Sequence, residues 1–178
     1  MFRGLGPAAL VFATMIFPLP VLSAGASQCV SAEQADAMTS PVDLAEHILA
    51  CFGERRDDRA AELLILMQLR TKFDAERVAD ETAKLGGQVL SLTLRQKAGP
   101  EWKERINRAA GALLQPESER FTAFCGLMHR LGPPRYHPDY MIQHGMEDYR
   151  ETGEAELVAG FDAGQEWAKL IGGYLRCK

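Results

Sequence analysis

The chain has 178 residues, of which 20 are basic and 24 acidic, so its formal net charge at pH 7 is −4. This acidic balance argues against nucleic acid and anionic membrane surfaces as partners. A leader is followed by about 150 residues, which is the usual size of one domain with a core of its own.

Residues 1–26 have the three-part layout of a secretory signal peptide. Arg3 supplies a positive charge, an apolar run follows, and Ala24 and Ala26 occupy the small-residue positions that signal peptidase prefers. The apolar run is shorter than the ~20 residues needed to span a bilayer. We therefore expect cleavage after Ala26 and release of residues 27–178 into the periplasm as one domain, with no membrane insertion of the mature chain.

All four cysteines follow the leader, at Cys29, Cys51, Cys125 and Cys177. An even number of cysteines in an exported chain predicts two disulfides, and three pairings are possible. Because no two cysteines form a CxxC pair, zinc knuckles, redox motifs and haem attachment lack their usual signature. Of the three pairings, we expect Cys51 with Cys125 and Cys29 with Cys177, since chain termini often lie close together.

The first helices of the mature chain are indicated by capping patterns. Ser31 and Gln34 form a capping-box pattern that opens a short helix. Ser40 and Pro41 open a second helix, in which apolar residues recur at helical spacing until Gly53 ends it.

The next segment, from Ala60 to Phe73, is apolar almost all round and predicts a buried central helix. Asp74 then provides a second cap signal, from which a further helix is expected to run as far as Gly86 and Gly87. Residues 88–96 fit a short strand nearly as well as a helix, and their helical neighbours favour helix.

Four further helical segments complete the chain. Apolar faces occur over 102–114 and 119–131, and the second of these places Cys125 inward. A short helix is expected from about Asp139 to Tyr149, and a last one from Ala155 to about Leu175. The fold class is therefore all-α, a single irregular bundle of seven or eight helices held by two disulfides.

Residues 132–146 gather three prolines, two tyrosines, two histidines and an arginine. The prolines restrict the loop, so it can present side chains at low entropic cost, and tyrosine and arginine are typical interface anchors. The expected partner-binding residues are Arg135, Tyr136, His137, Tyr140 and His144. The alternative is that the prolines only turn the chain and the tyrosines pack against the domain.

The catalytic motifs of common enzyme classes are missing from the sequence. It has no GxSxG elbow, no glycine-rich phosphate loop and no cysteine left over as a nucleophile. His137, His144 and Glu147 could form a metal triad, although strict HExxH spacing is missing. We expect a non-enzyme without cofactor or metal. The alternatives are a small periplasmic metal-dependent hydrolase that uses this triad, and a carrier of an apolar ligand between helices.

The organisation of the chain resembles that of the periplasmic immunity proteins made against type VI secretion toxins. The resemblance is based on the leader MFRGLGPAALVFATMIFPLPVLSAGA, the four spaced cysteines and the loop GPPRYHPDYM. The resemblance covers the mature chain and involves no diagnostic motif, so no site is carried over from the family. It implies an exported protein that binds a cognate toxin and occludes its active site, with a few buried anchors supplying the affinity.

Overall fold

The computed structural model describes residues 27–145 and 157–178, so the predicted leader lies outside the described residues. Within these ranges the fold is all-α, as predicted. The helices are α1 (Pro41–Gly53), α2 (Asp57–Arg77), α3 (Gly86–Ala98), α4 (Trp102–Leu113), α5 (Glu119–Leu131), α6 (Asp139–Ile142) and α7 (Ala163–Leu170), with 3-10 turns η1 (Ala32–Gln34) and η2 (Ala83–Leu85) and a π-helical turn η4 (Ile171–Leu175). None of these helices has the length and apolar character needed to cross a bilayer.

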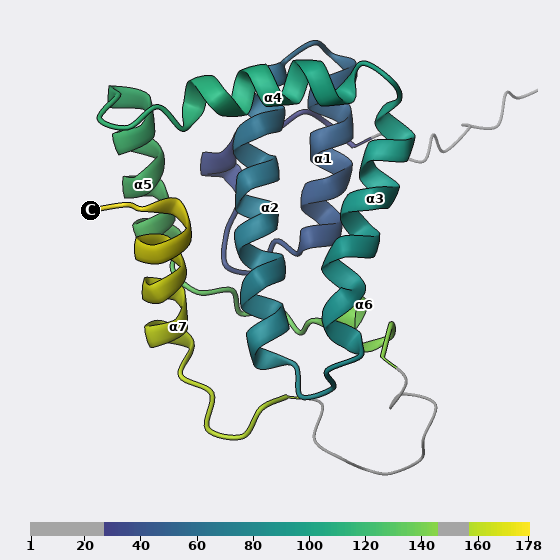
Figure 1. Cartoon of the computed structure of the whole chain (residues 1–178), viewed down its shortest axis with the longest axis vertical. Coiled ribbons are helices and arrows are strands. Elements are labelled where there is room, and N and C mark those ends of the chain that lie inside the picture. Colours follow the sequence, from purple (N-terminus) through teal and green to yellow (C-terminus); the bar gives the residue numbers. More distant parts are fainter. Residues whose placement is uncertain (1–26, 146–156) are drawn as a thin grey trace, which may run out of the picture.

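The helix α2 occupies the centre of the bundle, as its apolar sequence predicts. It is flanked by α1 and α3 on one side and by α5 and α7 on the other, while α4 lies across one end (Figure 1). Leu63, Leu66, Met67, Leu69 and Phe73 of α2 are all fully buried. Burial of each such side chain contributes about 1.5–3 kcal/mol relative to exposure, so the core is organised around this one helix.

The capping patterns near the N-terminus are confirmed. Gln34 accepts a hydrogen bond from the backbone N–H of Ser31 at the start of η1. At the start of α1, the Ser40 hydroxyl accepts from the backbone N–H of Asp43, and the Asp43 carboxylate accepts from that of Ser40. Such a cap typically contributes about 1 kcal/mol, so these starts are encoded locally.

The prediction that Asp74 caps a new helix is wrong. The helix α2 continues without interruption to Arg77, and the Asp74 carboxylate is buried and occupied by other side chains. Gly86 and Gly87 likewise begin α3 and do not end a helix. The ambiguous segment 88–96 lies inside α3 and is helical, as its neighbours indicated.

The expected disulfide pairing is also wrong, because Cys29 and Cys177 are not bonded to each other and each is bonded to a helix. Cys29 pairs with Cys51 of α1, and Cys125 of α5 pairs with Cys177. Two bridges with no free cysteine agree with the predicted count and with an oxidising compartment. A native disulfide typically stabilises a domain by about 2–4 kcal/mol, so the segments around Cys29 and Cys177 are held to α1 and α5.

The last helix begins later than predicted. It was expected from Ala155, but α7 starts at Ala163, where the Asp162 carboxylate accepts a hydrogen bond from a first-turn backbone N–H. Before it, Leu157 forms an isolated antiparallel bridge with Val78 at the end of α2. This extended pairing explains why the helix cannot start earlier.

A buried polar cluster connects α2 to the proline-rich loop. The Tyr136 and Tyr140 hydroxyls donate to the same Asp74 oxygen, at 2.8 and 2.9 Å, and Arg77 Nε donates to the other oxygen at 2.8 Å. Burial raises the pKa of Asp74, an effect that the Arg77 charge and the two hydroxyls oppose. Burial also raises the pKa of both tyrosines, so their phenols stay protonated and remain donors.

Arg70, one turn before Asp74, extends the same cluster to the N-terminal segment. Its guanidinium is fully buried and donates to the backbone carbonyls of Asp36 and Thr39. The backbone N–H of Arg135 donates to the Ala37 carbonyl at 2.7 Å, which joins the loop directly to this turn. One face of α2 therefore fixes two segments that lie far apart in sequence.

The double variant Tyr136→Phe/Tyr140→Phe is expected to lower the free energy of unfolding. Each substitution removes a hydrogen-bond donor from a buried carboxylate, at a typical cost of about 1–3 kcal/mol. Urea unfolding measures the change, and Arg135→Ala in the same loop serves as control. Because the Arg135 side chain is exposed, its removal is expected to stay within about 0.5 kcal/mol. An unchanged midpoint for the double variant would show that the cluster does not hold the loop.

Candidate functional site

The structure divides the predicted loop site into two groups of residues. Tyr136 is buried and Tyr140 half-buried, and both hydroxyls are directed at Asp74, in agreement with the packing alternative. Arg135, His137 and His144 are exposed. Partner binding by this loop stays a prediction, now restricted to those three exposed residues.

The proposed metal triad is not assembled from the described residues. His137 Nδ1 lies 2.6 Å from a carboxylate oxygen of Asp139, and Glu147 falls outside the described ranges. The helix predicted over 139–149 is α6, which ends at Ile142. Within 27–145 and 157–178, no three His, Cys, Asp or Glu side chains come together as metal ligands. The triad therefore stays a hypothesis.

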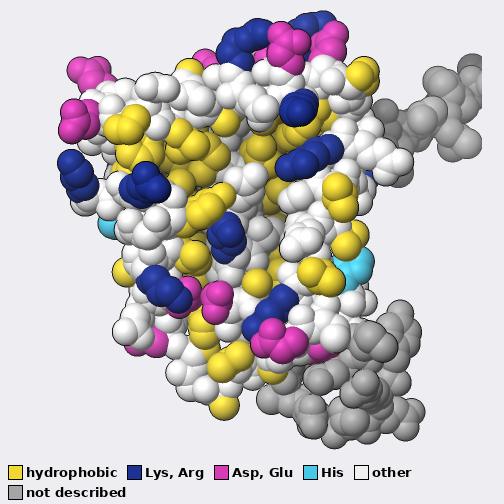
Figure 2. Space-filling view, viewed as in Figure 1, with side chains coloured by type: hydrophobic (Ala, Val, Ile, Leu, Met, Phe, Trp, Pro, Cys, Tyr) yellow, Lys and Arg dark blue, Asp and Glu magenta, His cyan; other side chains and the backbone are white. Residues whose placement is uncertain are grey.

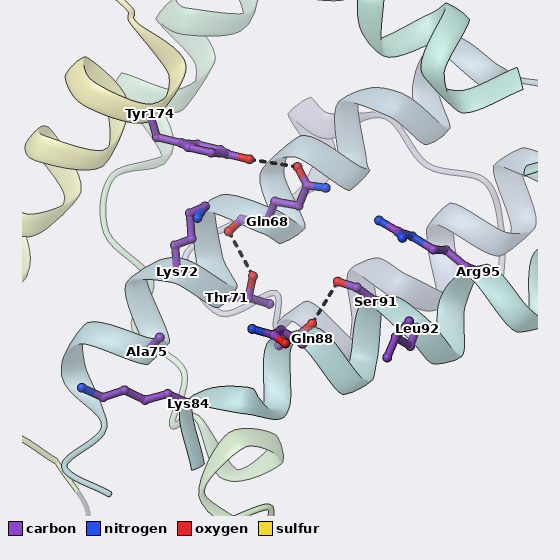
Figure 3. Close-up of a pocket in the computed structure, with 11 residues that line it drawn as sticks. Gln68, Thr71, Lys72, Ala75, Lys84, Gln88, Ser91, Leu92, Arg95 and Tyr174 are labelled. Carbon is purple, nitrogen blue, oxygen red and sulfur yellow. Dashed lines mark hydrogen bonds between the residues drawn. The ribbon is translucent and has the colours of Figure 1, made fainter. Parts of the chain in front are cut away.

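A groove of about 510 Å³ runs between α2 and α3 and extends to Tyr174 near the C-terminus (Figure 3). From α2 it receives Gln68, Thr71, Lys72 and Ala75, and from α3 and the turn before it Lys84, Gln88, Ser91, Leu92 and Arg95. None of the lining side chains is acidic. In a chain of net charge −4, this is a local reversal of charge.

The groove exists because α3 approaches α2 closely at a glycine. A methyl group on Gly87 would lie 2.9 Å from Thr71 Cβ, which is shorter than side chains tolerate. The hydroxyls beside this contact are already engaged, since Thr71 donates to the Gln68 carbonyl and Ser91 donates to the Gly87 carbonyl. The cations are thus the charged groups that the groove offers to a ligand, beside the side-chain amides of Gln68 and Gln88.

The three cations of the groove differ in their partners. Lys72 Nζ lies 4.6 Å from the ring centroid of Tyr174, whose hydroxyl donates to Gln68 Oε1 at 3.3 Å. Lys84 pairs with Glu81 at 2.6 Å. Within the described ranges, neither Lys72 nor Arg95 forms a salt bridge, and Arg95 points from α3 toward α2 (Figure 3). Two of the three positive charges are therefore open to an anionic group.

An apolar stripe on α3 and the turn before it borders the groove. Leu85, Val89 and Leu92 are 57%, 42% and 63% exposed, and their i, i+4, i+7 spacing places them on one face. Leu92 belongs to both the stripe and the groove. Figure 2 shows hydrophobic and basic side chains together at the centre of this side of the molecule, with acidic ones toward the two ends.

This arrangement is suited to binding. The lining contains no carboxylate, imidazole or thiol, and its hydroxyls on Thr71 and Ser91 are engaged with backbone carbonyls. Cations next to exposed leucine and valine side chains match a ligand that is both acidic and partly apolar. The adjacent stripe and groove extend along the length of α3, which suits an elongated ligand.

This site was not predicted from the sequence. Lys84, Gln88, Ser91 and Arg95 recur at i, i+4, i+7 and i+11, which is one face of a helix. That signal was available only if residues 88–96 were already known to be helical. The close approach of α3 to α2 at Gly87 and the presence of Tyr174 in the groove lining depend on tertiary packing. Neither has a signal in the local sequence.

Comparisons with protein-family models, with curated proteins and with solved structures give no match to this chain. We therefore infer the function of the chain from the geometry and chemistry of the groove.

A pair of glycine substitutions tests the close approach of α3 to α2. Gly87→Ala is expected to lower the free energy of unfolding by about 1–3 kcal/mol, because the added methyl overpacks against Thr71. Gly111→Ala in α4 is the matched control: it has open space around it, and alanine there should raise stability by about 0.5–1 kcal/mol. If urea unfolding gave both variants the same sign, the contact at Gly87 would not define the groove.

Proposed function

We propose that this chain is an exported, periplasmic binding protein whose α2–α3 groove docks an acidic, amphipathic segment of a partner protein. The observation that carries the proposal is a groove with three cations and no carboxylate in a chain that is acidic overall. The predicted signal peptide and the two disulfides support an oxidising compartment.

The apolar stripe favours a protein segment over a simple polyanion. Leu85, Val89 and Leu92 offer a helical face to apolar side chains, while Lys72 and Arg95 stand beside it for acidic ones. An amphipathic helix in a groove combines both kinds of group at i, i+3 and i+4 spacing. Apolar burial would supply most of the affinity, and the exposed charges would mainly steer association and select the partner.

The resemblance to type VI immunity proteins suggests what the partner is. A toxin active in the periplasm would be neutralised when the chain covers its active site, and an acidic toxin surface is the chemistry that this groove selects. The groove differs from the loop first expected to act, in which Tyr136 and Tyr140 are committed to Asp74. Arg135, His137 and His144 could form a secondary contact at the edge of such a complex.

The test uses residues 27–178 with both disulfides intact and a synthetic helical peptide with leucines on one face and glutamates elsewhere. Lys72→Glu/Arg95→Glu is expected to weaken peptide binding at least about tenfold, which corresponds to about 1.4 kcal/mol. Binding by the wild type should also weaken as ionic strength rises. Fluorescence anisotropy measures both effects.

The matched control is Lys97→Glu, which changes an exposed cation of α3 that does not line the groove. It should bind the peptide as the wild type does. Equal weakening by Lys97→Glu, or equal binding of a peptide with lysines in place of glutamates, would contradict the groove as the docking site.

The toxin assignment has a separate test in the product of the neighbouring reading frame. If that product is the cognate toxin, the wild-type chain should inhibit it, and Lys72→Glu/Arg95→Glu should inhibit it less. A neighbouring product that does not bind the chain would contradict the assignment and leave the peptide result unaffected.

A further inference from the structure

A second cavity, of about 520 Å³, shares Gln68 and Tyr174 with the groove. Its walls are mainly apolar and come from α2, from the turn between α4 and α5, from α5 and from the C-terminal segment. The apolar members are Ile65, Leu114, Pro116, Phe121 and Leu175. The hydrogen bond between Tyr174 and Gln68 lies at the boundary, because both residues line both sites.

Two cations complete the lining of this pocket. Arg176 and Lys178 flank Cys177, and the disulfide from Cys177 to Cys125 fixes the segment against α5. No Asp or Glu side chain lines the pocket, and within the described ranges neither Arg176 nor Lys178 forms a salt bridge. The positive charges are thus placed at an apolar cavity by a covalent anchor.

We infer that this pocket binds a single-chain amphiphile with a carboxylate head, a fatty acid. Its volume is within the range of about 300–1,000 Å³ typical of small-molecule sites, and such sites combine apolar walls with a few polar groups that orient the ligand. The acyl chain lies against Ile65, Leu114 and Phe121, and the carboxylate pairs with Arg176 and Lys178. Charge complementarity selects the acid over neutral or cationic amphiphiles.

This inference does not depend on the proposed function, because its decisive residues differ from those of the groove. Leu114, Phe121, Arg176 and Lys178 do not line the groove, and Lys72 and Arg95 do not line the pocket. Lys72→Glu/Arg95→Glu should therefore lose the acidic peptide and keep the fatty acid. The two claims can fail separately.

Arg176 allows the head-group contact to be tested without damage to the fold. Its φ of +61° is in the left-handed region, which glycine adopts without strain, so Arg176→Gly removes the cation and suits the backbone. The double variant Arg176→Gly/Lys178→Gln should therefore have an unfolding temperature equal to that of the wild type or higher. Leu114→Glu changes the apolar wall at a position that is 40% exposed, so this variant should also fold.

The experiment is calorimetric titration of disulfide-bonded residues 27–178 with dodecanoate below its micelle concentration, and with dodecyltrimethylammonium as the cationic amphiphile of equal chain length. We expect saturable one-to-one binding of dodecanoate, at least about tenfold tighter than that of the cation. Arg176→Gly/Lys178→Gln should remove this preference, Leu114→Glu should abolish binding, and Lys97→Gln should change neither.

The absence of saturable dodecanoate binding would overturn the inference. Equal affinity for dodecanoate and dodecyltrimethylammonium would also overturn the inference. The pocket would then accept any apolar chain, including a side chain of a partner protein. Retained preference for dodecanoate in Arg176→Gly/Lys178→Gln would exclude these cations as the carboxylate partners.

Discussion

The buried carboxylate of Asp74 is the constraint on which the rest of the arrangement depends. An ionised carboxylate inside a helical core is costly unless it is paired and hydrogen-bonded. Arg77, Tyr136 and Tyr140 provide that pairing, which obliges the proline-rich loop to lie along α2. Arg70 fixes the 36–39 turn on the same face.

The groove begins beside the Asp74 face of α2 and extends round to the far side of the helix. At 100° per residue, Thr71 projects about 60°, Gln68 about 120° and Lys72 about 160° from Asp74, so the covered face and the binding face share one helix. A rigid central helix with one face fully occupied can present the other without rearrangement. The buried cluster thus supports binding indirectly, by fixing the scaffold from which Lys72 is presented.

The C-terminal segment connects the two candidate sites. Tyr174 lines both the groove and the apolar pocket, and the disulfide at Cys177 fixes the residues that follow Tyr174. The helix that was expected to run to about Leu175 ends in a π-helical turn over 171–175, and the left-handed Arg176 follows it.

Helix positions could be predicted from the sequence because capping and apolar periodicity are local signals, as Ser40 and the run before Phe73 show. The predictions that were wrong concern residues whose partners lie far away in the sequence. Asp74 has the chemistry of a cap, and its true partner Tyr136 lies 62 residues away. Tyrosine on a stiff loop indicates an interface or a buried anchor equally well. The acidic net charge of the whole chain gives no sign of a local basic groove. Cysteine pairing likewise follows from tertiary packing, which residue spacing does not encode.

Two-dimensional NMR of residues 27–178, labelled with ¹⁵N and titrated with the acidic helical peptide, shows directly whether the α2–α3 groove is the docking surface. We expect the largest amide shift changes over 68–75 and 84–95, with small changes over 132–140. Largest changes in the loop around Arg135 and His137, with an unperturbed groove, would contradict it.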